Sequence, residues 1–178
     1  HTGSSAASDV YKRQVCAWNS SWGNKGVSMK NSVEVKNISF SYGKTEILND
    51  LSLDIKEGEF MVLLGPSGCG KTTLLNCIAG LLDLTNGQIW IEDDNVTWKE
   101  PKDRHIGMVF QSYALYPSMT VEKNLSFGLR MMGTAKDLIN EKIKKAANLL
   151  QINELLKRKP SQLSGGQRQR VAIGRALV

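Results

Sequence analysis

GPSGCGKT, residues 65–72, is the stretch of this sequence that decides the fold. It fits the phosphate-loop pattern G-x-x-x-x-G-K-[ST] at every position. The continuous apolar run 60–64 precedes it and has the length expected of a buried strand. A helix-like run, 71–79, follows it, and Gly80 is a plausible helix stop. A strand, a glycine-rich loop and a helix in this order predict an α/β fold with a site for phosphate groups.

Each part of the loop has a physical task. The glycines let backbone N–H groups approach phosphate oxygens, and the following helix directs its positive N-terminus at the same anion. Lys71 supplies a point charge between the β- and γ-phosphates, and the Thr72 hydroxyl is a ligand for Mg²⁺. We interpret Cys69 as a small space-filling side chain, with a reactive thiol as the alternative. The residues expected to bind the phosphates of a nucleotide here are Gly65, Pro66, Ser67, Gly68, Cys69, Gly70, Lys71 and Thr72.

A second short motif, Leu163-Ser164-Gly165-Gly166-Gln167, lies near residue 178. Ser164 is suited to cap a helix that continues to Leu177, and the two glycines leave its N–H groups open to an anion. With the phosphate loop, this motif makes residues 33–178 resemble the ATP-binding cassette (ABC) ATPase family. The resemblance implies a P-loop NTPase core of ABC type, with an antiparallel β subdomain and a helical insert over about 112–167.

The resemblance also assigns roles at single positions. Tyr42 matches the aromatic residue that stacks on adenine, although a strand-end Tyr is usually only packing. Gln111 matches the glutamine that approaches Mg²⁺ and the attacking water, so Lys71 and Gln111 are the expected catalytic residues and Thr72 and Gln111 the expected metal contacts. Thr73 matches a phosphate-contacting hydroxyl. The motif residues that would contact ATP held by the opposite subunit are Ser164, Gly165, Gly166 and Gln167.

The segment from Lys102-Asp103-Arg104 through IGMVFQSYALYPSMTVEKNLSFGL resembles the sugar-importer branch, the maltose and glycerol-3-phosphate type. Ser118 departs from that branch, and polyamine and inorganic-anion importers share much of the pattern. The resemblance implies an ATPase subunit that works as a homodimer or beside a paired ABC subunit. Its expected partners are integral membrane permease subunits and, indirectly, an extracytoplasmic solute-binding protein. Its expected location is peripheral, at the cytoplasmic face of the cell membrane.

Composition sets limits on other functions. The 178 residues are 41% hydrophobic and 22% charged, which suits one globular domain. The net charge of +6 is spread along the chain without a block of five like charges, so no nucleic-acid partner is expected. Three cysteines without CxxC spacing disfavour a zinc site or a disulfide framework and favour a reducing compartment. No apolar run reaches the roughly 18 residues that span a bilayer.

The two ends of the sequence suggest a non-native leader and an incomplete domain. Residues 1–28 lack periodicity and contain SSAASDVYKRQ, which resembles a sequencing-library adapter, so we interpret them as a non-native leader. Residues 29–178 are then an incomplete ABC nucleotide-binding domain. The family's Mg²⁺-holding Asp, water-polarising Glu and loop His would follow residue 178, so this chain alone is expected not to hydrolyse ATP. Rival interpretations are a soluble ABC ATPase of DNA repair or translation and a non-catalytic nucleotide-binding module.

Periodicity predicts the remaining elements. Strands are expected over 33–42, 47–55, 88–92 and 106–110, in addition to 60–64. Helices are expected over 120–132 and 135–150. In the second of these helices, a face for core packing is formed by Ile139, Ile143, Ala146, Ala147 and Leu150.

Overall fold

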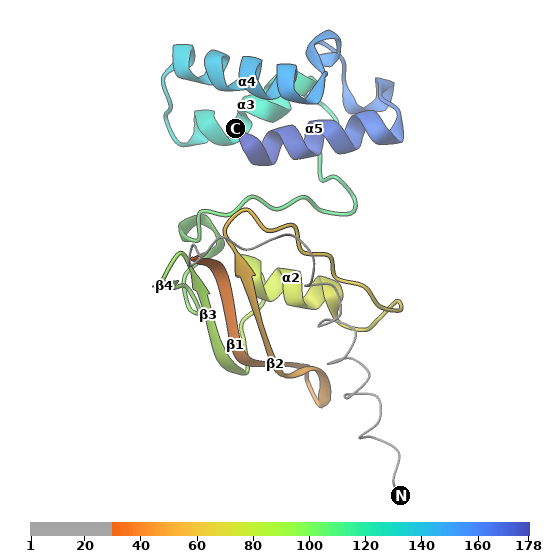
Figure 1. Cartoon of the computed structure of the whole chain (residues 1–178). Coiled ribbons are helices and arrows are strands. Elements are labelled where there is room, and N and C mark those ends of the chain that lie inside the picture. The colour runs from red at the N-terminus through yellow and green to blue at the C-terminus, as the bar shows by residue number, and fades with distance from the viewer. Residues whose placement is uncertain (1–29) are drawn as a thin grey trace, which may run out of the picture. The chain divides into compact units, whose positions relative to one another are not determined.

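A computed structural model describes residues 30–178, which form two compact units (Figure 1). The described part of the first unit covers residues 30–105, and the second unit covers residues 106–178. The interpretation of residues 1–28 as a leader lies outside the described residues.

The first unit contains a four-stranded antiparallel sheet in the order β2-β1-β3-β4. Its long strands β1 (Asn31–Tyr42) and β2 (Thr45–Lys56) form a hairpin, and β3 (Asn86–Ile91) pairs with the other edge of β1. The short β4 (Asp94–Asn95) closes the sheet. The strands expected over 33–42, 47–55 and 88–92 are therefore confirmed, with bounds that differ by a few residues.

Opposed irregularities in β1 and β2 explain why the buried positions do not alternate strictly. Asn37 and Asp50 have positive φ angles of 50° and 47° and face each other across the hairpin. The Asn37 amide donates to Asp50 Oδ1 at 2.8 Å, and the backbone N–H of Asn37 donates to Ser52 Oγ at 2.8 Å. The bulge turns Val35 and Ile38, three residues apart, toward the same side, where both are buried.

Helix α2 (Lys71–Ala79) packs on the sheet and ends at Gly80, as expected from the sequence (Figure 1). Gly80 has a φ of 76°, and its N–H bonds to the carbonyl of Cys77. The helix and the sheet share one hydrophobic core, made of Val35, Ile38, Phe40, Leu48, Leu74, Cys77, Leu84, Ile89 and Val96. This core holds the helix that begins at the phosphate loop.

Two predicted strands were wrong. Residues 60–64 form no strand, and Phe60, Val62 and Leu64 are exposed by 91%, 57% and 82%. Residues 106–110 also form no strand, and Gly107 lies instead against Ala176. A strand needs a neighbour to take its backbone hydrogen bonds. Within the described residues, the four-stranded antiparallel sheet provides no neighbouring strand for either segment. An apolar run alone was therefore not sufficient to predict a strand.

The second unit is helical. It contains α3 (Val121–Met131), α4 (Lys136–Leu150) and α5 (Gly165–Leu177), with short 3-10 turns η2 (Asn153–Leu155) and η3 (Pro160–Gln162) between the last two. A further turn, η1 (Pro101–Asp103), belongs to the first unit. The helices expected over 120–132 and 135–150 are confirmed to within one residue at each end. The core of this unit consists of Val121, Leu125, Leu129, Ile139, Ile143, Ala147, Ile152, Leu155, Leu163 and Val171.

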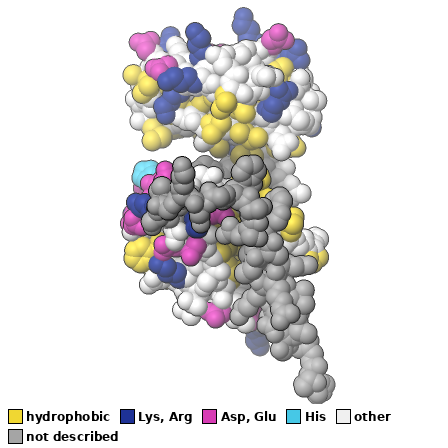
Figure 2. Space-filling model, in the orientation of Figure 1, with side chains coloured by type: hydrophobic (Ala, Val, Ile, Leu, Met, Phe, Trp, Pro, Cys, Tyr) yellow, Lys and Arg dark blue, Asp and Glu magenta, His cyan; other side chains and the backbone are white. Residues whose placement is uncertain are grey.

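Hydrophobic side chains reach the surface of both units (Figure 2). In the second unit, Met131 and Met132 at the end of α3 are 70% and 82% exposed. The helices within residues 30–178 include none with the length and hydropathy of a membrane span.

Candidate nucleotide-binding site

The phosphate loop connects residues 60–64 to α2 and presses against β2. Gly70 occupies the N-cap of α2 with a φ of 93°. A Cβ at this position would lie 3.1 Å from Leu48 and 3.3 Å from Ile47, so glycine permits both the backbone angle and the close approach. Residues 65–68 are exposed, and the loop closes on itself through the Cys69 N–H, which donates to the carbonyl of Pro66 at 3.4 Å.

Lys71, the first residue of α2, reaches back across this loop. Its ammonium group donates to the carbonyls of Gly65 and Pro66 at 2.8 and 2.7 Å and to Cys69 Sγ at 3.2 Å. In residues 30–178 these partners include no carboxylate and none of the ion pairs includes Lys71, so the loop positions the positive charge without an acidic partner. This arrangement suits an anionic ligand better than an internal ion pair.

The beginning of α2 adds further donors. Among residues 30–178 no side chain caps this helix, and its first turn contains no acidic residue, so within this part of the chain its N-terminal N–H groups and the positive end of its dipole stay available. The loop therefore fits a phosphate group. Thr72 exposes its side chain in this turn and Thr73 is half-buried. The described residues contain no cluster of three or more His, Cys, Asp or Glu that could hold a metal ion.

Tyr42 ends β1 and is 56% exposed. Its ring meets Phe40 edge-on, with the centroids 4.8 Å apart and the planes at 87°. Phe40 itself is buried in the core, so it fixes one edge of the tyrosine ring. The contact leaves Tyr42 exposed enough to stack on a planar ligand.

The pentapeptide 163–167 forms a capped helix start in the second unit. Ser164 Oγ accepts the N–H of Gln167 at 3.3 Å, and Gln167 Oε1 accepts the N–H of Ser164 at 2.9 Å, a reciprocal capping box. Cβ atoms built on Gly165 and Gly166 meet nothing within 4 Å. The expected cap is confirmed, both glycines are exposed, and their N–H groups have no acceptor inside the helix.

Gln111 is exposed and begins a loop of unusual backbone geometry in the second unit. Tyr113 and Ala114 have φ angles of 63° and 48°, a conformation that non-glycine residues adopt rarely. The guanidinium of Arg175, from α5, donates to the carbonyls of both residues and lies over the Tyr116 ring at 5.9 Å. Arg175 therefore holds the strained loop next to Gln111.

Sequence reasoning missed two buried polar residues. Asn124 in α3 is fully buried and makes four hydrogen bonds to the loop 116–120. Arg104 is 3% exposed and bonds to four backbone carbonyls in the first unit. Burial lowers the pKa of Arg104, and it raises the pKa of the Cys77 thiol to about 11. Cys77 is therefore a neutral core side chain at neutral pH.

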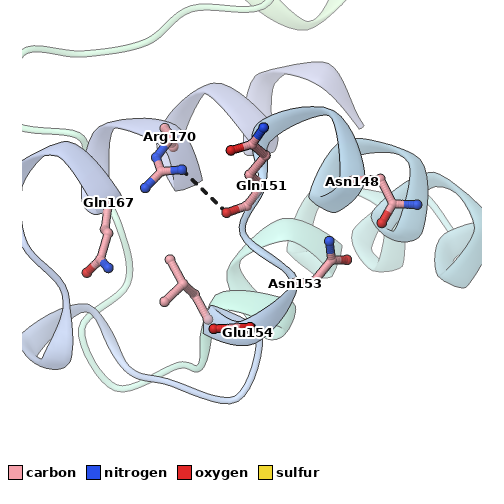
Figure 3. Close-up of a pocket in the computed structure, with 7 residues that line it drawn as sticks. Asn148, Gln151, Asn153, Glu154, Gln167 and Arg170 are labelled. Carbon is pink, nitrogen blue, oxygen red and sulfur yellow. Dashed lines mark hydrogen bonds between the residues drawn. The ribbon is translucent and has the colours of Figure 1, made fainter.

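A cavity of about 370 Å³ lies beside α5 in the second unit (Figure 3). It is lined by Gln167 and Arg170 of α5 and by polar residues around the end of α4, including Gln151 and Glu154. Arg170 points across it and donates to the Gln151 carbonyl at 3.4 Å. The lining includes Gln167 but not Ser164, Gly165 or Gly166, so the cavity meets the start of α5 only at Gln167.

Comparison with known sequences agrees with these motifs. The sequence model of the family described as "ABC transporter" matches residues 48–178, which is most of the chain and includes both the phosphate loop and the capped pentapeptide. The chain belongs to the ABC transporter family.

Curated relatives of this family member include the sn-glycerol-3-phosphate import ATP-binding protein UgpC of Escherichia coli K12. The two are 58% identical over 136 residues, which cover 76% of this chain and 38% of the relative. UgpC of Salmonella choleraesuis SC-B67 is 57% identical over the same length. The matched part thus spans about two fifths of these relatives' length.

Solved structures support the ABC fold. The dimeric bacterial ABC transporter cassette MJ0796 matches with a TM-score of 0.71 and 33% identity, covering 82% of this chain and 68% of that one. CbiO1 of Clostridium perfringens, part of the ABC transporter complex cbiONQ, matches with a TM-score of 0.74 and 30% identity, covering 83% and 61%. The expected fold class, an α/β P-loop NTPase core of ABC type with an antiparallel sheet and helices, is confirmed.

Proposed function

We propose that this ABC family member is part of an ATP-binding subunit that couples ATP binding and hydrolysis to the import of a small solute. The similarity to an sn-glycerol-3-phosphate import subunit supports a solute of the sugar or glycerol-3-phosphate type. The observation that carries the nucleotide part is the position of Lys71. Its charge lies across the phosphate loop without a carboxylate partner among the described residues, at a helix start that no side chain of those residues caps.

Each side chain of the loop then has a task toward MgATP. The free N–H groups at the start of α2 bind the phosphates, and the Lys71 ammonium leaves its carbonyl partners to contact the β- and γ-phosphates. The Thr72 hydroxyl contacts Mg²⁺, and Thr73 contacts a phosphate. Tyr42 stacks on adenine. Mg²⁺, when bound, would neutralise charge that develops on the phosphates, and Gln111 would be a contact for Mg²⁺ and for the attacking water.

The capped pentapeptide forms the other half of the site in a head-to-tail pair of subunits. The exposed N–H groups of Gly165 and Gly166, with Ser164 and Gln167, bind the γ-phosphate of ATP held by the opposite subunit. The dimeric cassette among the similar structures supports this pairing. The partner is a second copy or a paired ABC subunit.

The whole protein acts at the cytoplasmic face of the cell membrane as a peripheral subunit. Its membrane partners are integral permease subunits, and an extracytoplasmic solute-binding protein acts with it indirectly. Co-purification of the whole protein with permease subunits tests this part of the proposal. Purification of the whole protein alone from a cell that contains those subunits would contradict it.

MgATP binding to the chain tests the nucleotide part. Lys71→Ala should weaken MgATP binding at least tenfold in calorimetric titration, because the phosphates lose a charge-assisted hydrogen bond. Lys56→Ala, which removes an exposed lysine at the end of β2, is the matched control and should bind as the wild type does. Equal affinity of the Lys71→Ala variant and the wild type would remove the basis for the assignment.

A further inference from the structure

Arg104 is a buried cation that its neighbourhood does not neutralise with an ion pair. Its side chain lies in the first unit with 3% exposure, and none of the ion pairs formed by residues 30–178 includes it. Burying a charge is costly unless hydrogen bonds replace its water. Four backbone carbonyls serve that purpose here, so the position of the guanidinium is strictly defined.

The four carbonyls belong to two different segments. Nη1 donates to the carbonyls of Cys77 and Ile78, both at 2.9 Å, in the last turn of α2. On the other side, Nη2 donates to the Thr97 carbonyl at 3.0 Å and Nε to the Lys99 carbonyl at 2.9 Å, in the segment after β4. The guanidinium therefore joins the end of α2 to the segment that follows β4. It also places a positive charge at the negative end of the helix dipole.

Gly80 provides the space for this contact. A Cβ at Gly80 would lie 2.5 Å from Arg104 Nε and 2.7 Å from its Cζ, closer than atoms of a folded protein approach each other. Gly80 also has a φ of 76°. The glycine therefore has two separate effects: it ends α2, and it admits the guanidinium to the carbonyls of the last turn.

The opposite end of α2 carries the phosphate loop. The helix has nine residues, about 14 Å, and begins at Lys71. Because so short a helix moves as a rigid rod, a clamp on its last turn sets the position of its first turn. We propose that Arg104 is a positioning residue for nucleotide binding: it clamps the end of α2 so that the N–H donors of the loop and the Lys71 ammonium converge on the phosphates. This inference rests on the proposed function of the loop.

A matched pair of glycine variants tests the clamp. Gly80→Ala and Gly58→Ala introduce the same side chain at nearly equal φ angles, 76° and 74°, but only the first collides with Arg104, since a Cβ on Gly58 meets nothing within 4 Å. We expect MgATP affinity to fall about tenfold in Gly80→Ala, the loss typical of one misplaced charge-assisted hydrogen bond. Gly58→Ala should retain the wild-type affinity. Equal affinities in the two variants overturn the proposal.

Arg104→Lys adds an independent test, because lysine keeps the charge but lacks the fork that bonds four carbonyls. It should also bind MgATP about tenfold more weakly, with unchanged far-ultraviolet circular dichroism. Wild-type MgATP affinity in this variant overturns the proposal that Arg104 is a positioning residue.

Hydrogen exchange separates the clamp from the proposed function. Amides of residues 74–80 should exchange faster in Gly80→Ala and Arg104→Lys than in the wild type and Gly58→Ala. If the wild type does not bind MgATP, the proposed function fails, and hydrogen exchange alone tests whether Arg104 holds the end of α2. Unchanged protection of these amides in the two variants then overturns that role, and lost protection supports it.

Discussion

Substitution of Asn124 measures how much the hydrogen bonds to the loop 116–120 contribute to stability. Its amide is fully buried at the first turn of α3. Oδ1 accepts the N–H of Tyr116 at 2.8 Å, and Nδ2 donates to the carbonyls of Tyr116, Met119 and Thr120 at 3.1, 3.2 and 3.0 Å. Asn124→Leu keeps the number and branching of the side-chain heavy atoms and removes all four bonds.

The expected loss of stability in Asn124→Leu follows from these hydrogen bonds. Each net hydrogen bond contributes about 1 kcal/mol, and a backbone group left buried without a partner costs about 1–3 kcal/mol. The loop is partly exposed, so water replaces some of the lost partners. We therefore expect Asn124→Leu to lower the free energy of unfolding by about 2–4 kcal/mol.

Urea denaturation followed by circular dichroism at 222 nm measures this loss, because α3, α4 and α5 supply most of the helical signal. The matched control is Asn140→Leu, at an exposed position on α4, which should stay within about 0.5 kcal/mol of the wild type. A loss below about 0.5 kcal/mol for Asn124→Leu, at an unchanged denaturant slope, would refute the reasoning.

Three further predictions concern the helix start at Ser164, the composite site and the buried thiol. Ser164→Ala removes one half of the capping box and should lower the free energy of unfolding by about 1 kcal/mol; an unchanged urea midpoint contradicts this. Gly165→Asp fits the open space at the start of α5 and suits the helix dipole, so the chain should stay folded. Its carboxylate should nevertheless block ATP-dependent dimerisation of the whole protein by repelling the phosphate, and sedimentation that still shows the ATP-bound dimer would disprove the arrangement. The pKa of Cys77, about 11 in the folded chain against 9.0 ordinarily, means that the folded state holds the proton more tightly. Stability should therefore fall as the pH rises above 9, by about 1 kcal/mol between pH 8 and pH 10 from this group. Cys77→Ala should lack that part of the decrease, and an identical pH dependence in both proteins would contradict it.

Features fixed by a few neighbouring residues could be predicted from the sequence. The phosphate-loop pattern placed α2 and its stop at Gly80, and the Ser164 and Gln167 pair marked the start of α5. These signals are local, because a cap or a left-handed glycine acts within one turn. The buried face of α4 could also be predicted, since the spacing of its apolar residues alone identifies that face.

Features that depend on distant partners could not be predicted. The apolar run 60–64 has strand composition, but a strand forms only with a neighbour, and the described sheet leaves it unpaired. Arg104 and Asn124 stood inside the segment that suggested the importer branch, yet nothing nearby indicated their burial. Their roles depend on carbonyls that folding brings to them: Cys77 and Ile78 are more than 25 residues from Arg104.

The unpaired run 60–64 has a practical consequence for work with this chain. Phe60, Val62 and Leu64 present three large apolar side chains to water on an extended backbone whose polar groups also need partners. Such a segment can recruit an identical segment from another molecule, since that pairing satisfies both requirements at once. Self-association should therefore increase with protein concentration. Light scattering should accompany every binding titration to detect it. Val62→Lys, which places a charge in the middle of the run, is a rational choice for preparing a dispersed sample.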